Sequence, residues 1–123
     1  MIIFDVYGHL DYIARYIPAN SYTYDWHDFN DLICLILKTI IEQGKGIEIN
    51  TAGLKYGMPE PNPCLDIVKI YHDLGGEIIT VGSDAHEVKF FAYRFDVVAD
   101  MLKNAGFNYY TIFNERKPEF IRL

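Results

Sequence analysis

The spacing of hydrophobic side chains changes several times along the chain, and each change predicts a different element. Residues 2–7 are a short β-favouring run that ends at Gly8, which predicts a strand. Residues 28–43 have the three- and four-residue spacing of one helix face, with Asp28 as the expected N-cap and Gly44 as the expected stop. The apolar positions of this helix are Leu32, Ile33, Ile36, Leu37, Ile40 and Ile41.

Strand and helix patterns continue to alternate in the rest of the chain. Strands are predicted at 46–50, 77–81 and 109–113, helices at about 65–74 and 90–105, and loops at 17–27 and 51–63. The strand at 77–81 shows little polar alternation, which is typical of a parallel strand that is buried on both faces. Strands separated by helices therefore predict an α/β fold with parallel pairing.

Two architectures fit this order of elements. Successive βαβ units cross over right-handedly, so the chain builds either an open doubly wound sheet or part of a (β/α) barrel. Four strands are too few to close a barrel. In both architectures the functional groups gather on loops at the carboxyl ends of the strands, and those loops are where candidate site residues are sought.

Composition narrows the class of protein. The 123 residues, 50% apolar and 23% charged, predict one globular domain. The longest apolar run, Leu32–Leu37, is far shorter than the ~20 residues of a membrane span, and no leader opens the chain, so a cytoplasmic protein is expected. Cys34 and Cys64 lie in apolar helical patterns and are expected as buried free thiols. The net charge of −6 disfavours nucleic-acid binding and suits a site that collects divalent cations.

Histidine and carboxylate side chains follow two of the predicted strands. His9 and Asp11 come just after the first strand, and Asp84 and His86 just after the third. Nitrogen and carboxylate ligands that converge from neighbouring strand ends suit Zn²⁺, Mn²⁺ or Fe²⁺. Taken singly, His9 could instead be a loop histidine with backbone hydrogen bonds, and Asp84 an N-cap.

The remaining polar residues differ in whether they lie near the end of a predicted strand. Glu48 and Asn50 share one face of the second strand near its end, because alternate residues of a strand point the same way. His72 lies on a helix beside an aspartate, and His27 lies in a polar loop, so both are interpreted as solvated surface residues.

Several segments resemble the PHP (polymerase and histidinol phosphatase) superfamily, and within it the histidinol-phosphatases. Gly8–Asp11 (GHLD) resembles the third motif of these phosphoesterases, and Gly82–His86 (GSDAH) resembles their distinctive fourth motif. Glu48–Lys55 (EINTAGLK) and Phe113–Pro118 (FNERKP) resemble segments of the histidinol-phosphatase branch. The family fold is a distorted (β/α)7 barrel, so the resemblance implies that residues 1–123 form its last strands and helices, a carboxyl-terminal portion.

The resemblance also implies a reaction and the residues for it. Family members hydrolyse phosphomonoesters with three metal ions at the strand ends, in histidine biosynthesis for this branch. By carry-over, His9 binds one metal ion, Asp84 a second and His86 a third. Lys55 stands where the histidinol-phosphatases often carry arginine, and with Arg15 it is a candidate for binding the substrate phosphate. Asp11, Glu48 and Asn50 are expected beside these ligands.

The amino-terminal His-x-His motif of the family and its later His and Glu ligands are absent from these residues. The leading hypothesis is therefore a fragment of a histidinol-phosphatase that is inactive alone, acting on a small phosphomonoester when complete. The alternative is a non-catalytic scaffold or interaction module. A nucleic-acid enzyme of the polymerase-associated branch is disfavoured by the acidic charge. Part of a barrel leaves open sheet edges and apolar surface, so a homo-oligomer is expected.

Overall fold

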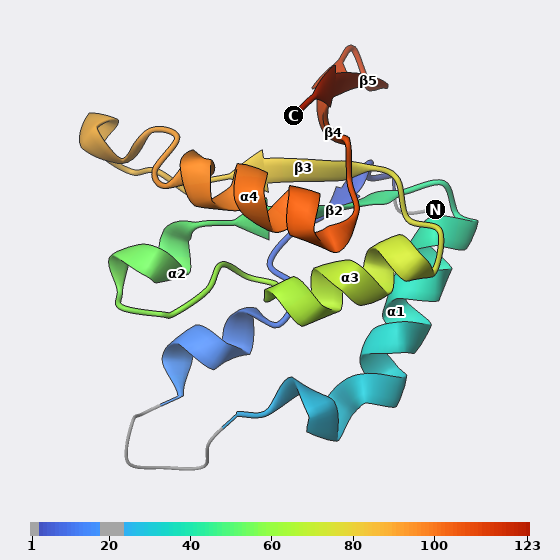
Figure 1. The fold of residues 1–123 in the computed structure, drawn as a ribbon, viewed down its shortest axis with the longest axis horizontal. Coiled ribbons are helices and arrows are strands. Elements are labelled where there is room, and N and C mark those ends of the chain that lie inside the picture. Colours follow the sequence, from blue (N-terminus) through green and yellow to red (C-terminus); the bar gives the residue numbers. More distant parts are fainter. Residues whose placement is uncertain (1–2, 18–23) are drawn as a thin grey trace.

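The computed structural model describes residues 3–17 and 24–123. Three parallel strands form its central sheet in the order β1–β2–β3 (Figure 1). They are Val6–Tyr7 (β1), Gly46–Asn50 (β2) and Ile79–Gly82 (β3). β2 pairs on both sides, with Ile47 opposite Tyr7 on one edge and opposite Ile79 on the other. The carboxyl ends of all three strands consequently meet at one edge of the sheet.

Three helices cover the sheet and close the core. They are Asn30–Glu42 (α1), Leu65–Asp73 (α3) and Phe95–Ala105 (α4), and α3 packs between the other two (Figure 1). A short helix, Ala52–Lys55 (α2), follows β2, and 3-10 turns lie at Tyr12–Tyr16, Trp26–Phe29 and Val88–Phe90. The fully enclosed side chains of the core are Leu37, Ile47, Ile49, Ile67, Val68, Tyr71, Ile79 and Leu102. No helix in the described ranges is long and apolar enough to cross a membrane.

The last predicted strand exists but does not join the parallel sheet. Tyr109–Asn114 (β4) pairs antiparallel with Lys117–Arg122 (β5), a strand that the hydrophobic pattern does not predict. β4 stays beside β3 through the hydroxyl of Thr111, which accepts a hydrogen bond of 3.1 Å from the Ile79 backbone N–H. The structure therefore has a three-stranded parallel sheet plus a hairpin, which corrects the expectation of four parallel strands.

The hairpin is hard to see in the sequence because of its turn residues. Glu115 and Arg116 occupy the two turn positions, and both have left-handed backbones, with φ of 47° and 64°. Two-residue turns of this kind normally carry Asn-Gly or Asp-Gly, which adopt positive φ easily. A Glu-Arg pair gives no such signal. Arg116 is held instead by a two-pronged hydrogen bond to Asp5, at 2.8 and 2.9 Å, which also lowers the pKa of that carboxyl.

The other corrections concern where elements begin. The first long helix starts at Asn30 and lacks the predicted Asp28 cap, because a separate 3-10 turn, capped by Asp25, precedes it. Helix α4 starts at Phe95 rather than about residue 90, since Arg94 adopts a left-handed backbone, and it ends at Gly106 as predicted. The described part of the chain also places α2 inside the predicted loop 51–63. Residues 18–23 of the other predicted loop lie outside the described residues.

Both cysteines are free thiols, as the sequence predicts. Cys34 lies on α1, and Cys64 precedes α3. Each is only partly buried, whereas the apolar patterns predict full burial. Burial raises the pKa of the Cys64 thiol, which makes it a weaker nucleophile at neutral pH.

The close approach of β2 to β3 predicts a stability effect at Gly46. A Cβ atom there would lie 2.5 Å from the Ile78 carbonyl oxygen, a backbone atom that cannot move without disturbing the sheet. Gly46→Ala is expected to lower the free energy of unfolding by about 1–3 kcal/mol, measured by urea denaturation. Gly8→Ala is the matched control, because a Cβ atom at Gly8 meets only the tip of the Glu48 side chain, at 3.2 Å. Equal losses in the two variants would contradict the explanation.

Candidate metal and phosphate site

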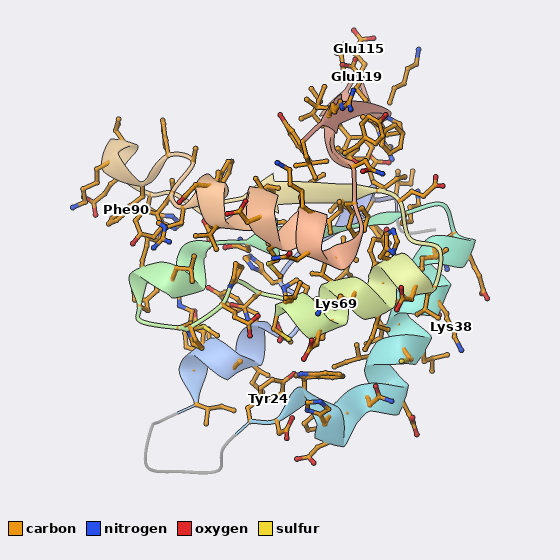
Figure 2. The ribbon with its side chains drawn as sticks, viewed as in Figure 1. Tyr24, Lys38, Lys69, Phe90, Glu115 and Glu119 are labelled. Carbon is orange, nitrogen blue, oxygen red and sulfur yellow. The ribbon has the colours of Figure 1, made fainter. Side chains whose placement is uncertain are left out.

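The carboxyl ends of the strands surround a pocket of about 270 Å³. Its walls come from the turn after β1, from α2 after β2 and from the loop after β3, which lie together at the left of Figure 1. Phe90, which is labelled in Figure 2 near α2, belongs to this lining. The lining residues are Tyr12, Arg15, Tyr16, Ala52, Lys55, Tyr56, Asp84, His86, Glu87 and Phe90. Four of the predicted site residues are among them.

Asp84 and His86 reach the pocket from the loop after β3. Asp84 is exposed and has a left-handed backbone, with φ of 47°. The Nδ1 atom of His86 lies 3.1 Å from the Asp84 carbonyl oxygen. A carbonyl can only accept, so a hydrogen bond here requires the proton on Nδ1, and in the neutral ring Nε2 is then the nitrogen with the lone pair that a metal ion would need. The loop thus presents one carboxylate and one imidazole nitrogen.

Lys55 and Arg15 bring positive charge to the same pocket from two other segments. The ammonium of Lys55 lies 3.4 Å from the Asp84 carbonyl oxygen and 3.5 Å from that of Ser83, so backbone groups anchor it against the third-strand loop. Arg15 lies at the end of the turn after β1 and donates a hydrogen bond to the Tyr12 hydroxyl. Among the described residues, neither cation takes part in an ion pair.

His9 lies next to the pocket but does not line it. Its ring packs on Tyr12, which does line the pocket, with the ring centroids 4.4 Å apart. The His9 backbone is left-handed, with φ of 57°, and its side chain is exposed. In residues 3–17 and 24–123, no three His, Cys, Asp or Glu side chains are placed so that they could hold a metal ion. The donor types suit a transition metal, but the described residues do not make a complete metal site.

Glu48 explains why β3 ends with glycine. Its Oε2 atom accepts a hydrogen bond of 3.3 Å from Asn50, on the same face of β2. A Cβ atom at Gly82 would lie only 2.3 Å from the Glu48 Oε1 atom. Glycine at this position therefore leaves room for the carboxylate across the strand ends. Glu48 and Asn50, predicted to share one face of the strand, are hydrogen-bonded to each other and do not line the pocket.

Asp11, which was expected beside the metal ligands, lines a neighbouring pocket. Its Oδ1 atom accepts a hydrogen bond of 2.9 Å from Asn62, 51 residues away, and burial raises its pKa to about 6. Asp11 lines a neighbouring pocket of about 240 Å³ with Tyr24 and Glu60. The structure therefore separates Asp11 from the pocket that holds Asp84.

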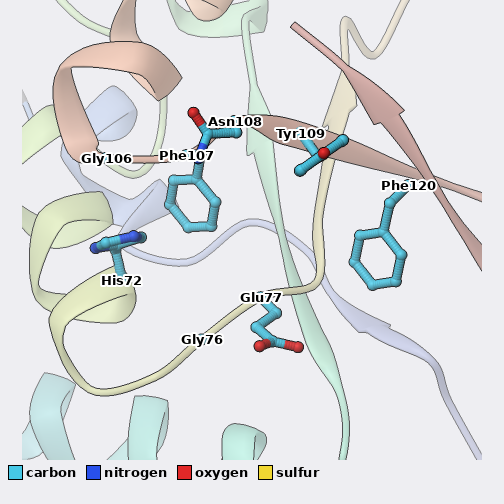
Figure 3. Close-up of a pocket in the computed structure, with 8 residues that line it drawn as sticks. All are labelled: His72, Gly76, Glu77, Gly106, Phe107, Asn108, Tyr109 and Phe120. Atoms are coloured by element: carbon cyan, nitrogen blue, oxygen red, sulfur yellow. The ribbon is translucent and has the colours of Figure 1, made fainter.

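The two remaining histidines lie away from the strand ends. His27 is exposed and pairs with Asp25 at 2.5 Å, in agreement with a surface interpretation. His72 corrects that interpretation, because it is half-buried, and its ring meets Phe107 edge-on at 4.9 Å. It lines a pocket of about 430 Å³ with Glu77 (Figure 3). Glu77 precedes β3, so this pocket lies at the amino end of that strand, opposite Asp84.

Sequence reasoning missed the aromatic lining of the site. Tyr12, Tyr16, Tyr56 and Phe90 all contribute to its wall, and none of them is among the residues predicted for the site. A signal was present in the spacing. Tyr12 and Tyr16 flank Arg15 within one turn, and Tyr56 directly follows the other candidate cation.

Comparisons with known proteins add an independent line of evidence. No protein-family model matches the chain. A probable histidinol-phosphatase of Thermotoga maritima is 43% identical over 110 residues, which are 89% of this chain and 44% of the relative. A probable histidinol-phosphatase of Clostridium acetobutylicum is 32% identical over 102 residues, 83% of this chain and 40% of the relative. The chain thus spans less than half the length of the curated relatives it matches.

A solved structure gives the same result. The histidinol phosphate phosphatase of Lactococcus lactis, in complex with zinc, L-histidinol and phosphate, superposes with a TM-score of 0.78 at 27% sequence identity. The match covers 94% of this chain and 44% of that one. It confirms the mixed α/β fold over part of such an enzyme. The chain is therefore homologous to one part of the histidinol-phosphatases of the PHP superfamily, as its motifs predict.

Proposed function

We propose that the chain forms one part of a metal-dependent phosphomonoester hydrolase of histidinol-phosphatase type. The observation that carries the proposal is one pocket lined by Asp84, His86, Arg15 and Lys55. Carboxylate and imidazole groups bind divalent transition metals, and cationic side chains recognise phosphate. The homologous enzyme of Lactococcus lactis, solved with zinc, L-histidinol and phosphate, supports zinc and a small phosphomonoester as ligands.

The residues of this chain have distinct roles in the proposal. Arg15 and Lys55 orient the phosphoryl group and offset its negative charge. His9, Asp84 and His86 are the proposed metal ligands, with Glu48 and Asn50 beside them. Because the described residues complete no metal site, we assign no chemical step to an ion that these residues alone would hold.

The proposal has a consequence for the isolated chain. In it, residues 1–123 supply the carboxyl-terminal portion of the phosphoesterase domain, and further metal ligands come from outside them. Up to three ions would each need such partners, so the chain alone should be inactive. The alternative function is a non-catalytic scaffold or interaction module, and the lack of a three-ligand group in the described residues is the observation that favours it.

A chimaera separates the two functions. Replacing the matching region of the Thermotoga maritima relative with this chain should give a protein that hydrolyses histidinol phosphate, because the rest of the relative would complete the metal site. Asp84→Asn in the chimaera should reduce turnover to background, whereas His72→Ala, at the opposite end of β3, should leave it unchanged. The measurement is phosphate release from histidinol phosphate. A 3′-phosphorylated oligonucleotide is assayed as a second substrate, to test for the nucleic-acid activity that the acidic charge disfavours. A folded chimaera without turnover would favour the scaffold.

The isolated chain should bind Zn²⁺ weakly and hydrolyse little or no phosphomonoester. His86→Ala should weaken Zn²⁺ binding at least roughly tenfold, as measured by calorimetry. Removing a group that only orients a metal ligand typically has an effect of this size, and removing a ligand should cost no less. His72→Ala is again the matched control. Clear turnover by the zinc-loaded chain that Asp84→Asn abolishes would contradict the expected inactivity, and unchanged zinc binding in His86→Ala would contradict the ligand assignment.

Exposed apolar residues on the outer face of α1 predict that the chain self-associates. Phe29, Leu32 and Leu35 are exposed on this side, and such apolar patches are normally covered. We expect a homo-oligomer that buries at least ~1,200 Å². Light scattering at tens of micromolar should show it, and Leu35→Lys should shift the protein toward monomer. Val88→Lys, at an exposed apolar position outside α1, should not. A monomeric unmodified chain would contradict the prediction.

A further inference from the structure

The proposed phosphate site leaves its aromatic residues without a role. Tyr56 is the most informative of these, because its side chain is 64% exposed and so does not serve to fill the core. Its ring lies against both candidate cations. The guanidinium carbon of Arg15 is 3.9 Å from the ring centroid, and the ammonium of Lys55 is 6.0 Å from it. One aromatic ring therefore lies near two positive charges from different segments of the chain, and the ring of Phe90 lies nearer to Lys55, at 4.8 Å.

Tyr12 contacts the same arginine in another way. Its hydroxyl accepts a hydrogen bond from Nη1 of Arg15 and a second one, of 3.3 Å, from the hydroxyl of Tyr16. The rings of Tyr12 and Tyr16 also lie near the guanidinium, at 5.3 and 5.4 Å. Arg15 is thus held by one hydroxyl acceptor and by three aromatic rings, which restricts a side chain that otherwise has many rotamers.

The partners of these two cations are suited to binding an anion. A carboxylate partner would neutralise Arg15 and compete with phosphate for its N–H donors. An aromatic face instead attracts the guanidinium through the ring quadrupole and leaves the remaining edge donors free. In the part of the chain that the structure describes, neither Arg15 nor Lys55 has an ion-pair partner. Tyr56 can therefore hold the two like charges together without cancelling them.

We propose that Tyr56 and Tyr12 are positioning residues that hold Arg15 and Lys55 as a two-cation clamp for a phosphoryl group. The inference rests on the proposed function for the identity of the anion. The two tyrosines act through different chemistry. Tyr56 acts through its ring face, whereas Tyr12 acts through its hydroxyl. This difference can be tested directly, because phenylalanine keeps the ring and removes only the hydroxyl.

The experiment titrates the 123-residue chain with inorganic phosphate in the presence of EDTA and follows the Arg15 Nε–H signal by NMR. Tyr56→Leu should weaken phosphate binding about 3- to 10-fold, and Tyr56→Phe should bind within about twofold of the unmodified chain. Tyr12→Phe should weaken binding, since Arg15 loses its acceptor. Tyr109→Leu is the matched control, an exposed tyrosine in the opposite pocket (Figure 3), and should have no effect.

Each contrary result has its own meaning. If Arg15→Ala weakens binding while Tyr56→Leu and Tyr12→Phe bind normally, the phosphate site stands and the positioning role is overturned. If Tyr56→Phe is as weak as Tyr56→Leu, or Arg15→Ala binds normally, the proposal also falls. Because Tyr56 is exposed, Tyr56→Leu should have the same circular dichroism spectrum and melting temperature as the unmodified chain. Tyr12→Phe tests the positioning role with a second variant.

The chimaera distinguishes this inference from the proposed function. In an active chimaera, Tyr56→Leu should raise KM for histidinol phosphate by the same factor and leave kcat within about twofold, which a general loss of structure would not do. An increase in KM that Tyr56→Phe does not show supports the clamp. A folded chimaera without turnover could still bind phosphate, more weakly in Tyr56→Leu and Tyr12→Phe but not in Tyr56→Phe. That result would support the clamp and contradict the proposed hydrolase function.

Discussion

The pairing of β2 with a parallel strand on each side is the constraint on which the rest of the structure depends. It places the ends of three strands at one edge, and the loops that follow them make the pocket. It also determines to which face of the sheet each side chain of β2 points. Ile47 and Ile49 are fully buried in the core, while Glu48 between them points to the other face. A shift of one residue in register would exchange these faces and remove both the core and the polar rim.

The sequence predicted those parts of the fold that local patterns specify. The bounds of β2 agree with the prediction, and α3 agrees within a residue, because apolar spacing and flanking glycines mark both. The hairpin β4–β5 was missed, since its left-handed turn uses Glu115 and Arg116 without glycine or asparagine. The position of that turn depends on the long-range pairing of Arg116 with Asp5, which no local pattern reports.

The candidate site was predictable to the extent that strand ends determine it. Asp84, His86 and Lys55 were named from strand-end loops and from the resemblance, and the structure brings them to one pocket. The position of Asp11 could not be predicted, because proximity in sequence to His9 says nothing of its contact with Asn62, 51 residues away. The tyrosines were missed because, in a single sequence, a tyrosine that lines a site cannot be distinguished from one that serves only for packing. Only their geometry around Arg15 shows otherwise.

Charge on two length scales agrees with the proposed ligand, a small phosphate ester. The net charge of −6 makes the surface unfavourable for a polyanion, whose many phosphates extend beyond the ~8 Å over which salt screens charges. Inside the pocket, Arg15 and Lys55 offset the two carboxylates of the lining, Asp84 and Glu87, and neither cation forms an ion pair among the described residues. A single phosphoryl group needs only the cations of this one pocket, whereas a nucleic-acid strand would also meet the acidic surroundings. The aromatic clamp lets two cations without ion-pair partners among the described residues share one pocket of an acidic protein, because rings stabilise the cations without neutralising them.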